Sequence, residues 1–382
     1  MCLLSHRELV ALQRDLEASM VGFAETDLRA ALIDVTEPTV YNTAKSYLTR
    51  VSKRLLGMAF LLAYRALAPH SKHRPGDLLA VATALEVRHA AILLHDDIVD
   101  GDTMRGGQPT AHHALAASPF AGEGASAAIF TGDLLAALAP LPILRSGLRP
   151  REKMRLSDAM LTLTAQVAAG QTAQLYLDTA CDLDATDEER ILAVHASNFH
   201  PYLNCSIHLA ADLAGTDGDT ATRITTAAIP IAQGFQVQND LAGFTELHRQ
   251  LVSGNSEALT FANTSDVSRR RRTTLMRAAL DQLTGTRRKR LLAYLRGDAA
   301  DLEEVIALVR ASGAFEHCAG LIASLFADAR DRLASDAQLP PEVRDALGDV
   351  WQYMLDLYDT DSDVSRLYLH ARADPHAPGQ AR

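Results

Sequence analysis

The amino-acid sequence predicts an all-α fold. Apolar residues recur at helical spacing, three or four positions apart, along almost all of the 382 residues. No segment shows the strict alternation of apolar and polar residues that is typical of a strand. Aromatic residues make up only 5% of the chain, and its 22 glycines and 14 prolines are near or below average. This composition favours helices over a β-sandwich or barrel.

Turns and loops divide the first half of the chain into amphipathic stretches. The turn at residues 36–38 closes the first stretch, Pro69 stops the second, and a loop rich in glycine and threonine at 101–109 follows the third. The predicted helices of this half are residues 5–33, 41–68, 75–98, 125–139 and 151–178.

The second half continues the same helical pattern. Pro201 lies inside one predicted helix and should kink or divide it. The predicted helices of this half are residues 186–214, 218–248, 274–295, 301–335 and 341–368. No internal repeat or low-complexity linker interrupts them. We therefore expect one helical domain over residues 1–370, with 1–38 as an N-terminal helical extension and 371–382 as a disordered tail.

The charge and cysteine content narrow the class of protein. A net charge of -10 argues against nucleic acid as a partner, because a phosphate-backbone binder needs a basic face. The four cysteines are scattered without metal-finger spacing, which indicates reduced thiols and a cytoplasmic location. No apolar run has the length of a signal peptide or of a membrane span. The expected ligands are therefore small molecules.

The densest acidic cluster lies in the last turn of the predicted helix 75–98 and just after it. Asp96 and Asp100 are four residues apart and share a helix face, while Asp97 lies about 100° round the axis. Carboxylates this close repel one another unless a cation binds them, and hard oxygen ligands suit Mg²⁺. A solvated helix end is the alternative, but the helix dipole disfavours acids at a C-terminus and the preceding run AAILL is apolar.

The sequence around this cluster resembles a known family. The run from Glu86 to Thr110, EVRHAAILLHDDIVDGDTMRGGQPT, is similar without a gap to the first aspartate-rich region of the trans-isoprenyl diphosphate synthases. The resemblance covers residues 40 to 335. Its further matches, in the family's order, are Gly132-Asp133-Leu134-Leu135, Gly170-Gln171, Gly234-Phe235-Gln236, Asn239-Asp240 and the stretch VIALVRASGAFEHCAGLIASLFADARDRL.

The resemblance implies an antiparallel helix bundle of the isoprenoid-synthase type around a deep central cavity, usually as a homodimer. Two aspartate-rich helix ends would face each other and hold Mg²⁺ on an allylic prenyl diphosphate. Alanine-rich helices at 125–139 and 157–173 would either form the cavity wall or pack closely against other helices. The residues implied as catalytic and metal-binding are Asp96, Asp97, Asp100 and Asp240. Those implied as substrate-binding are Arg105, Gln171, Gln236, Lys53, His89 and Asn239.

The second aspartate-rich motif departs from the family's DDxxD. The chain has Asn239 and Gly243 at the first and last positions, which leaves Asp240 as the one strong carboxylate. Glu246 lies two turns from Asn239 on a similar face, where it either supplements the site or is solvated.

The side that would bind isopentenyl diphosphate, the family's acceptor, departs further. The family's GGKRxRP segment is reduced, so Lys53 is kept but Leu56 replaces the second arginine. Gly106 replaces the arginine after Arg105, and Asn198-Phe199 stand where the family has Lys-Thr. Each lost charge-assisted contact is worth about 1.5–3 kcal/mol. These losses predict an acceptor other than isopentenyl diphosphate. A neutral or aromatic acceptor would need less positive charge and an apolar wall, which Leu56, Gly106 and Phe199 would supply.

The sequence thus predicts a Mg²⁺-dependent prenyltransferase that ionises an allylic donor and transfers the prenyl group to a small acceptor such as an indole-type aromatic. Ala90 and Ala91 leave room for a donor of fifteen or twenty carbons, while Arg88 either caps the cavity or faces solvent. The alternatives are a chain-elongating synthase, for example of geranylgeranyl diphosphate, a class I terpene-cyclase-like enzyme and a non-catalytic subunit. The run Arg269–Arg272 is either a diphosphate clamp or a solvated loop.

Overall fold

The computed structural model describes residues 5–32, 38–50, 52–71, 73–105, 107–117, 119–180, 186–253, 265–298 and 301–356. The prediction of an all-α fold is confirmed, because the two strands are two residues each. The elements are α1 (His6–Phe23), η1 (Ala24–Leu28, a π-helix), α2 (Arg29–Ala31), α3 (Pro38–Thr49), α4 (Leu55–Leu67), α5 (Pro75–Asp100), β1 (Met104–Arg105), β2 (Gln108–Pro109), α6 (Ala111–Ala116), α7 (Gly124–Leu138), α8 (Leu141–Arg145), α9 (Pro150–Ala180), α10 (Glu188–Ala214), α11 (Gly218–Ala227), α12 (Ile229–Ser253), α13 (Ser265–Ser268), α14 (Thr274–Gln282), α15 (Gly285–Arg296), α16 (Leu302–Arg310), α17 (Ala314–Ala334) and α18 (Pro341–Asp356).

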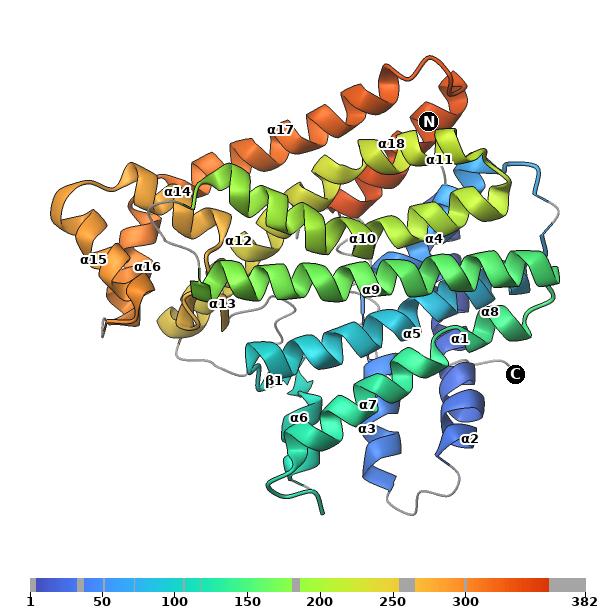
Figure 1. The fold of residues 1–382 in the computed structure, drawn as a ribbon, viewed down its shortest axis with the longest axis horizontal. Helices are drawn as coiled ribbons and strands as arrows, with labels where there is room; N and C mark the ends of the chain where they lie inside the picture. The colour runs from blue at the N-terminus through green and yellow to red at the C-terminus, as the bar shows by residue number, and fades with distance from the viewer. Residues whose placement is uncertain are drawn as a thin grey trace.

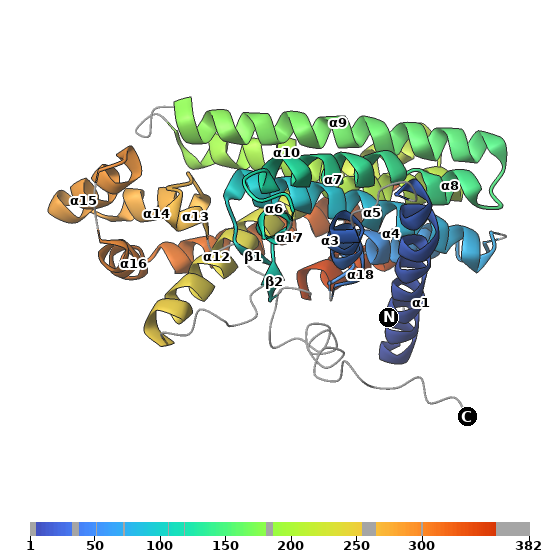
Figure 2. The same cartoon turned by 90° about the horizontal axis from the view of Figure 1, so that it is seen from below.

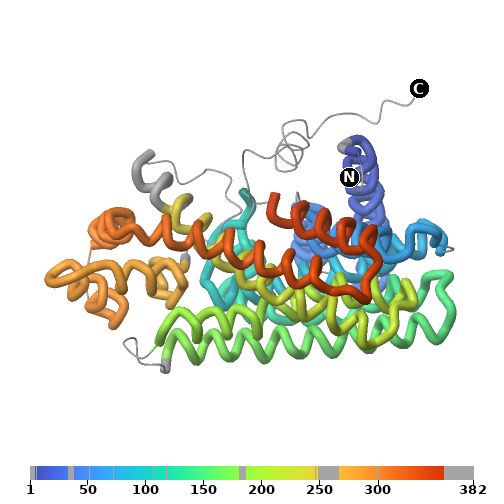
Figure 3. Tube along the Cα trace, turned by 90° about the horizontal axis from the view of Figure 1, so that it is seen from above, coloured from blue at the N-terminus to red at the C-terminus, as the bar shows by residue number. Residues whose placement is uncertain are grey.

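The long helices form a bundle with α4 and α5 at its centre (Figure 1). Almost every residue of α4 is buried, because its run of leucine, alanine and phenylalanine is apolar on all sides and packs against α5, α10 and α18. Helix α9 lies along one side of the molecule, paired with α10, and α17 and α18 lie along the other (Figures 2 and 3). Helix α5 itself packs against α1, α4 and α7, and this packing holds the acidic cluster at its C-terminal end in position.

A second, smaller apolar cluster lies at the end of the molecule formed by α14, α15 and α16. Leu275, Leu291 and Val305 from these three helices are almost fully buried in it, together with Cys318 of α17. This cluster also contains Val237 and Phe244 of α12, so it fixes the position of the second predicted acidic motif.

Several predicted helices are two helices in the structure. The predicted helix 41–68 is broken between α3 and α4, where Arg54 has the left-handed φ of 50°. Gly313, with a φ of 89°, separates α16 from α17. Conversely, α10 continues through Pro201 as one helix. Helical periodicity survives a break of a few residues, which is why these boundaries were not predicted.

By length and composition alone, two stretches of the described chain could cross a membrane, Pro75–Asp100 and Gly124–Arg145. The first is α5, which lies inside the bundle. The second contains α7 and α8, and one-third of its most apolar 18 residues is buried. The predicted absence of spans therefore rests on the packing of α5 and on what covers α7.

Some sequence predictions fall outside the described residues. They concern Gly106, the side chain of Glu246 and the tail at 371–382. The single-domain boundary at residue 370 also lies there and stays a prediction.

Candidate functional site

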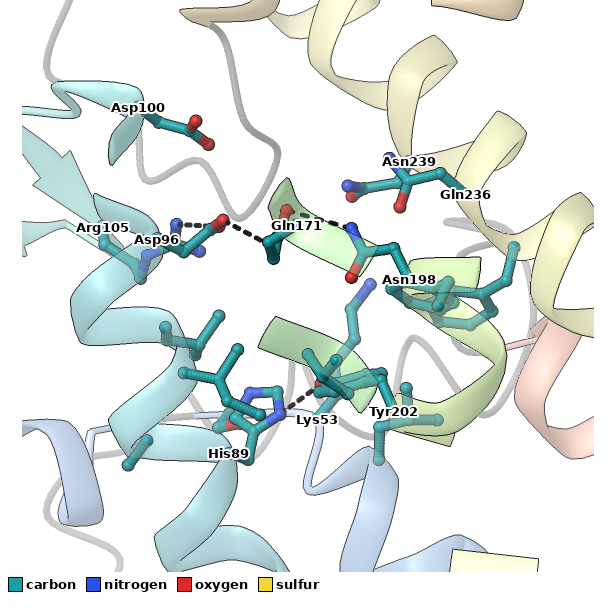
Figure 4. A pocket seen from close by; sticks show the side chains of 18 of the residues that line it. Lys53, His89, Asp96, Asp100, Arg105, Gln171, Asn198, Tyr202, Gln236 and Asn239 are labelled. Atoms are coloured by element: carbon teal, nitrogen blue, oxygen red, sulfur yellow. Dashed lines mark hydrogen bonds and ion pairs between the residues drawn. The ribbon is translucent and has the colours of Figure 1, made fainter. Parts of the chain in front are cut away.

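One cavity of about 230 Å³ gathers nine of the ten site residues that the sequence predicts. They come from the segment before α4, from α5, β1, α9 and α12, and they point toward one another (Figure 4). The lining members of the predicted set are Lys53, His89, Asp96, Asp100, Arg105, Gln171, Gln236, Asn239 and Asp240.

Asp97 is the exception, and its predicted role as a metal ligand needs correction. Its side chain is 0% exposed and does not line the cavity. One carboxylate oxygen accepts a hydrogen bond from Nε of Arg105, and the other accepts one from the Tyr47 hydroxyl at 2.5 Å. Because Asp97 lies about 100° round the helix from Asp96, it faces α3 while Asp96 and Asp100 face the cavity. The predicted trio is therefore two lining carboxylates and one buried anchor.

Arg105 is held beside the lining carboxylates by this anchor. Its Nη2 lies 3.8 Å from Asp96 and 3.6 Å from Asp102. Burial opposes the charged form of Arg105, but the charges of Asp97 and Asp96 outweigh it and raise its pKa. Arg105 therefore carries a permanent positive charge at the edge of the cavity.

The amide of Gln171 links α9 to the acidic end of α5. It donates a hydrogen bond to Asp96 at 3.3 Å and accepts one from Asn198 of α10 at 3.0 Å. The two helices approach closely because a Cβ on Gly170 would lie only 2.4 Å from the Cα of Asn198. The absence of a side chain on Gly170 thus allows α9 to approach α10 closely, which places the amide of Gln171 next to Asn198.

Helix α12 forms the facing wall, with Gln236, Asn239 and Asp240 (Figure 4 labels the first two). Gln236 donates to Oδ1 of Asp240 at 2.9 Å. Oδ2 of Asp240 has no hydrogen-bond partner among the described residues, although the side chain is only 4% exposed. Burial raises the pKa of Asp240 to about 8.

Arg271 closes the mouth between the two walls. It forms ion pairs with Asp100 of α5, with Asp266 at 3.3 Å and with Asp178 at 3.6 Å. Of the two interpretations of the arginine run, the solvated loop is therefore wrong for Arg271, which is only 15% exposed. Asp178 and Asp266 were missed by sequence reasoning. The signal for Asp266 was an acid five residues before this arginine.

The other end of the cavity is basic and aromatic. Burial lowers the pKa of Lys53 to about 7 and that of His89 to about 3, so His89 is neutral and hydrogen-bonds the Tyr202 hydroxyl (Figure 4). Phe199 lines the same region. It stacks on Phe235 at a centroid distance of 5.1 Å and contacts the tilted ring of Tyr202 at 5.0 Å.

Arg50 and His195 are among the lining residues that were not predicted, and Leu56, a predicted wall residue, is absent. Arg50 lines the cavity, with its guanidinium 3.7 Å from the centroid of the Tyr47 ring. His195 also lines it, and burial lowers its pKa to about 4. Leu56 is 0% exposed in the core and does not line the cavity, so its predicted place in an apolar acceptor wall is wrong.

Of the two alanine-rich helices, α9 lines the cavity through Val167, Gln171 and Gln174. No residue of α7 does so, because its small residues pack against α5 instead. A Cβ on Gly132 would lie 2.3 Å from the ring of His95, which shows how close this packing is. Close packing is therefore the correct interpretation for α7.

Solved structures of similar fold include the geranylgeranyl pyrophosphate synthase of Corynebacterium glutamicum complexed with isoprenyl diphosphate and magnesium. Its TM-score is 0.75 at 24% sequence identity, and the match covers 92% of this chain and 99% of that one. The polyprenyl synthase of Caulobacter crescentus CB15, complexed with calcium and isoprenyl diphosphate, has a TM-score of 0.70 at 19% identity. That match covers 91% of this chain and 97% of the Caulobacter chain.

Curated relatives give the same family. The short chain isoprenyl diphosphate synthase of Methanothermobacter thermautotrophicus is 24% identical over 87% of this chain and 95% of its own length. The geranylfarnesyl diphosphate synthase of Natronomonas pharaonis is 25% identical over 83% of this chain and 89% of its own length. The family model described as polyprenyl synthetase matches residues 37–311. The chain is therefore a prenyltransferase that belongs to the polyprenyl synthetase family.

Proposed function

We propose that this chain is a Mg²⁺-dependent synthase that elongates an allylic prenyl diphosphate with isopentenyl diphosphate. The observation that carries the proposal is the cavity itself, in which two acidic walls face each other and basic residues stand beside them. The similarity to geranylgeranyl and geranylfarnesyl diphosphate synthases supports elongation over transfer to another acceptor.

The residues of the two walls fit magnesium. Their ligands are carboxylate and amide oxygens, which are the groups that Mg²⁺ prefers, and Oδ2 of Asp240 is buried without a hydrogen-bond partner among the described residues. Asp96 and Asp100 on one wall and Asp240 on the other would hold the ions. When bound, Mg²⁺ neutralises the charge that develops on the departing diphosphate.

The chain's own groups would bind and orient the donor. Arg105, fixed by its pairing with Asp97, adds a permanent positive charge next to the diphosphate, and Gln171 holds Asp96 in place. The rings of Phe199 and Phe235 line the cavity and would exclude water from the allylic cation. Ala90 lines the cavity and keeps room for a donor of fifteen or twenty carbons.

Arg50 and Lys53 replace part of the positive charge that the acceptor side has lost. Both line the cavity, and Arg50 donates to the backbone oxygen of Arg105 at 3.2 Å, so it stands next to the donor's arginine. Arg50, and Lys53 below its lowered pKa of about 7, provide positive charge that suits a second diphosphate. Leu56 is buried in the core and does not line the cavity. The apolar wall that favoured an aromatic acceptor is therefore reduced to Phe199 and its aromatic neighbours.

An indole-type acceptor remains the second candidate, and the cluster of aromatic rings formed by Phe199, Phe235 and Tyr202 is the observation that favours it. Incubation with Mg²⁺, geranylgeranyl or farnesyl diphosphate and either isopentenyl diphosphate or indole distinguishes the two. We expect a longer prenyl diphosphate. Prenylated indole without elongation, or hydrocarbon from the donor alone, would contradict the proposal.

The Arg50→Gln variant tests the acceptor site directly. Losing one charge-assisted contact of about 1.5–3 kcal/mol should raise the KM for isopentenyl diphosphate by about 10- to 100-fold. Arg65→Gln, an exposed arginine on α4, is the matched control and should leave KM unchanged. An unchanged KM in Arg50→Gln would show that the acceptor diphosphate binds elsewhere.

The assembly proposed is a homodimer. On α9, Met154, Leu161 and Leu175 are exposed at multiples of seven residues, so they form one apolar stripe. On α7, Ile129 and Phe130 are exposed as well, by 45% and 72%. Apolar surface of this extent indicates a protein interface, and a second copy of the chain would cover it. A cytoplasmic location remains a prediction.

A further inference from the structure

The α12 wall is short of carboxylates. Asn239 and Gly243 stand where two acids would complete the motif, and only Asp240 provides a strong ligand. A neutral amide oxygen attracts a divalent cation less than a carboxylate does. If this wall binds metal as the α5 wall does, another anion must stand beside Asp240.

Asp266 stands at this position. It lines the cavity together with Asp240, although it comes from α13, and its side chain is 13% exposed. Asp96 lines the same cavity, and burial together with the charges of Asp240 and Asp96 raises the pKa of Asp266. Its one ion pair among the described residues is with Arg271.

The neighbouring acid, Asp178, links two segments of the chain through hydrogen bonds. Its Oδ1 accepts from the backbone N–H of Arg272 at 2.9 Å, and its Oδ2 accepts from Gln174 at 3.1 Å. It does not line the cavity. Asp178 therefore ties the segment after α13 to α9, and this tie places Asp266 at the wall.

Arg271 marks where a bridging cation would lie. Its guanidinium contacts Asp100 on the α5 wall and Asp266 on the other side. An ion between these carboxylates would take the place of the guanidinium. The unpartnered Oδ2 of Asp240 is an independent sign of a missing cation, because a buried carboxylate oxygen without a partner is costly.

We propose that Asp266 is a metal-ligating residue and supplies the carboxylate that Asn239 lacks, so that Asp240 and Asp266 together form the second metal-binding wall. No three acidic, histidine or cysteine side chains converge on one point in the described chain. Magnesium does not require such a cage, because one or two carboxylates suffice when diphosphate oxygens and water complete the shell. Ions held by either wall would have their coordination completed by oxygens of the bound diphosphate.

The test measures metal binding without turnover. Mn²⁺ is titrated into the full-length protein with inorganic pyrophosphate, and free Mn²⁺ is followed by electron paramagnetic resonance. We expect Asp266→Asn to weaken the binding of at least one Mn²⁺ by about tenfold or more. Asp328→Asn, an exposed acid on α17 that pairs only with Arg332, is the matched control and should bind as the wild type does.

A second variant separates ligation from a structural effect. Asn239→Asp restores a carboxylate to α12, so Asp266→Asn should cost little in that background. Equal losses with and without Asn239→Asp would overturn the proposal, as would wild-type binding by Asp266→Asn. Thermal unfolding in EDTA checks the fold, which the isosteric change should preserve because it removes a repelling charge.

This inference rests on the metal-dependent diphosphate chemistry of the proposed function, but the assay contains no prenyl donor and no acceptor. A failure of chain elongation would therefore leave its result unchanged. If the wild type binds no Mn²⁺ with pyrophosphate, both proposals are wrong.

Discussion

Arg271 forms an ion pair with Asp100 across the mouth of the cavity, joining the segment after α13 to the C-terminal end of α5. The same guanidinium reaches Asp178 and Asp266. In the protein without ligands, one arginine thus balances three acids that a metal and a diphosphate would otherwise balance. Arg271 is therefore the counter-ion of Asp100, Asp178 and Asp266.

Replacing Arg271 by Gln should destabilise the protein most when metal is absent. Three acids would then repel one another without a cation, at a cost of roughly 3 kcal/mol, typical of breaking a buried ion pair. Urea unfolding in EDTA should show this loss, and Mg²⁺ with pyrophosphate should recover most of it. Arg330→Gln, an exposed arginine on α17, is the control. Equal losses in both conditions would show that Arg271 is not in the position of the cation.

Arg105→Ala should cost about 3–5 kcal/mol in the free energy of unfolding, because it leaves the fully buried carboxylate of Asp97 with only the Tyr47 hydroxyl. Asp97→Asn in the same background removes the charge and should recover part of the loss. A double-mutant cycle by urea denaturation measures this coupling. Strictly additive effects would contradict the assignment of Asp97 as the anchor of Arg105.

The use of the acceptor should depend on pH through Lys53, whose pKa burial lowers to about 7. Lys53 is charged below that pH and loses its proton above it, so kcat/KM for isopentenyl diphosphate should fall as the pH rises from 7 to 9. Lys53→Arg keeps the charge and should remove this fall. If the profile is the same in both proteins, another group controls it.

The same shift predicts how stability changes with pH. Between about pH 7 and the ordinary lysine pKa of 10.5, the unfolded chain holds a proton on Lys53 that the folded chain lacks. Stability contributed by this group therefore rises with pH across that window. Lys53→Met should stabilise the protein most below pH 7 and by a decreasing amount toward pH 10, as measured by thermal unfolding.

The sequence predicted the fold class, and nine of its ten site residues line the cavity, because helical periodicity and one contiguous motif determine them. The position of Asp97 was also present in the sequence, since the helical period turns it away from Asp96. The place of Leu56 was not, because it depends on the left-handed Arg54 that starts α4. Asp266 and Arg271 reach the site through tertiary packing, so the sequence shows their spacing of five residues but not the carboxylates of α5 and α9 that Arg271 contacts.

The exposed Phe130 on α7 offers a test of the homodimer. A charge at the centre of an apolar interface opposes association, so Phe130→Glu should shift the protein from dimer to monomer in light scattering after size exclusion. Val21→Glu, an exposed apolar residue on α1, is the control and should remain dimeric. A monomeric wild type would show that this apolar face has another occupant.

Arg88 on α5 should be a source of instability. The sequence left open whether it caps the cavity or faces solvent, and the structure shows that it does neither. It is 2% exposed, it does not line the cavity, and its three guanidinium nitrogens have no hydrogen-bond partner among the described residues. A buried charge without hydrogen bonds costs free energy that an apolar side chain of similar length does not.

Arg88→Met should therefore raise the free energy of unfolding by about 1–4 kcal/mol, the range found when buried charges are replaced by apolar groups. Urea denaturation measures the change, with Arg65→Met on the exposed side of α4 as the control expected to shift little. A loss of stability in Arg88→Met would mean that the guanidinium is satisfied in solution. Arg88 lies on the same helix as Asp96 but does not line the cavity. Metal binding should therefore stay unchanged in Arg88→Met if the substitution affects only the core.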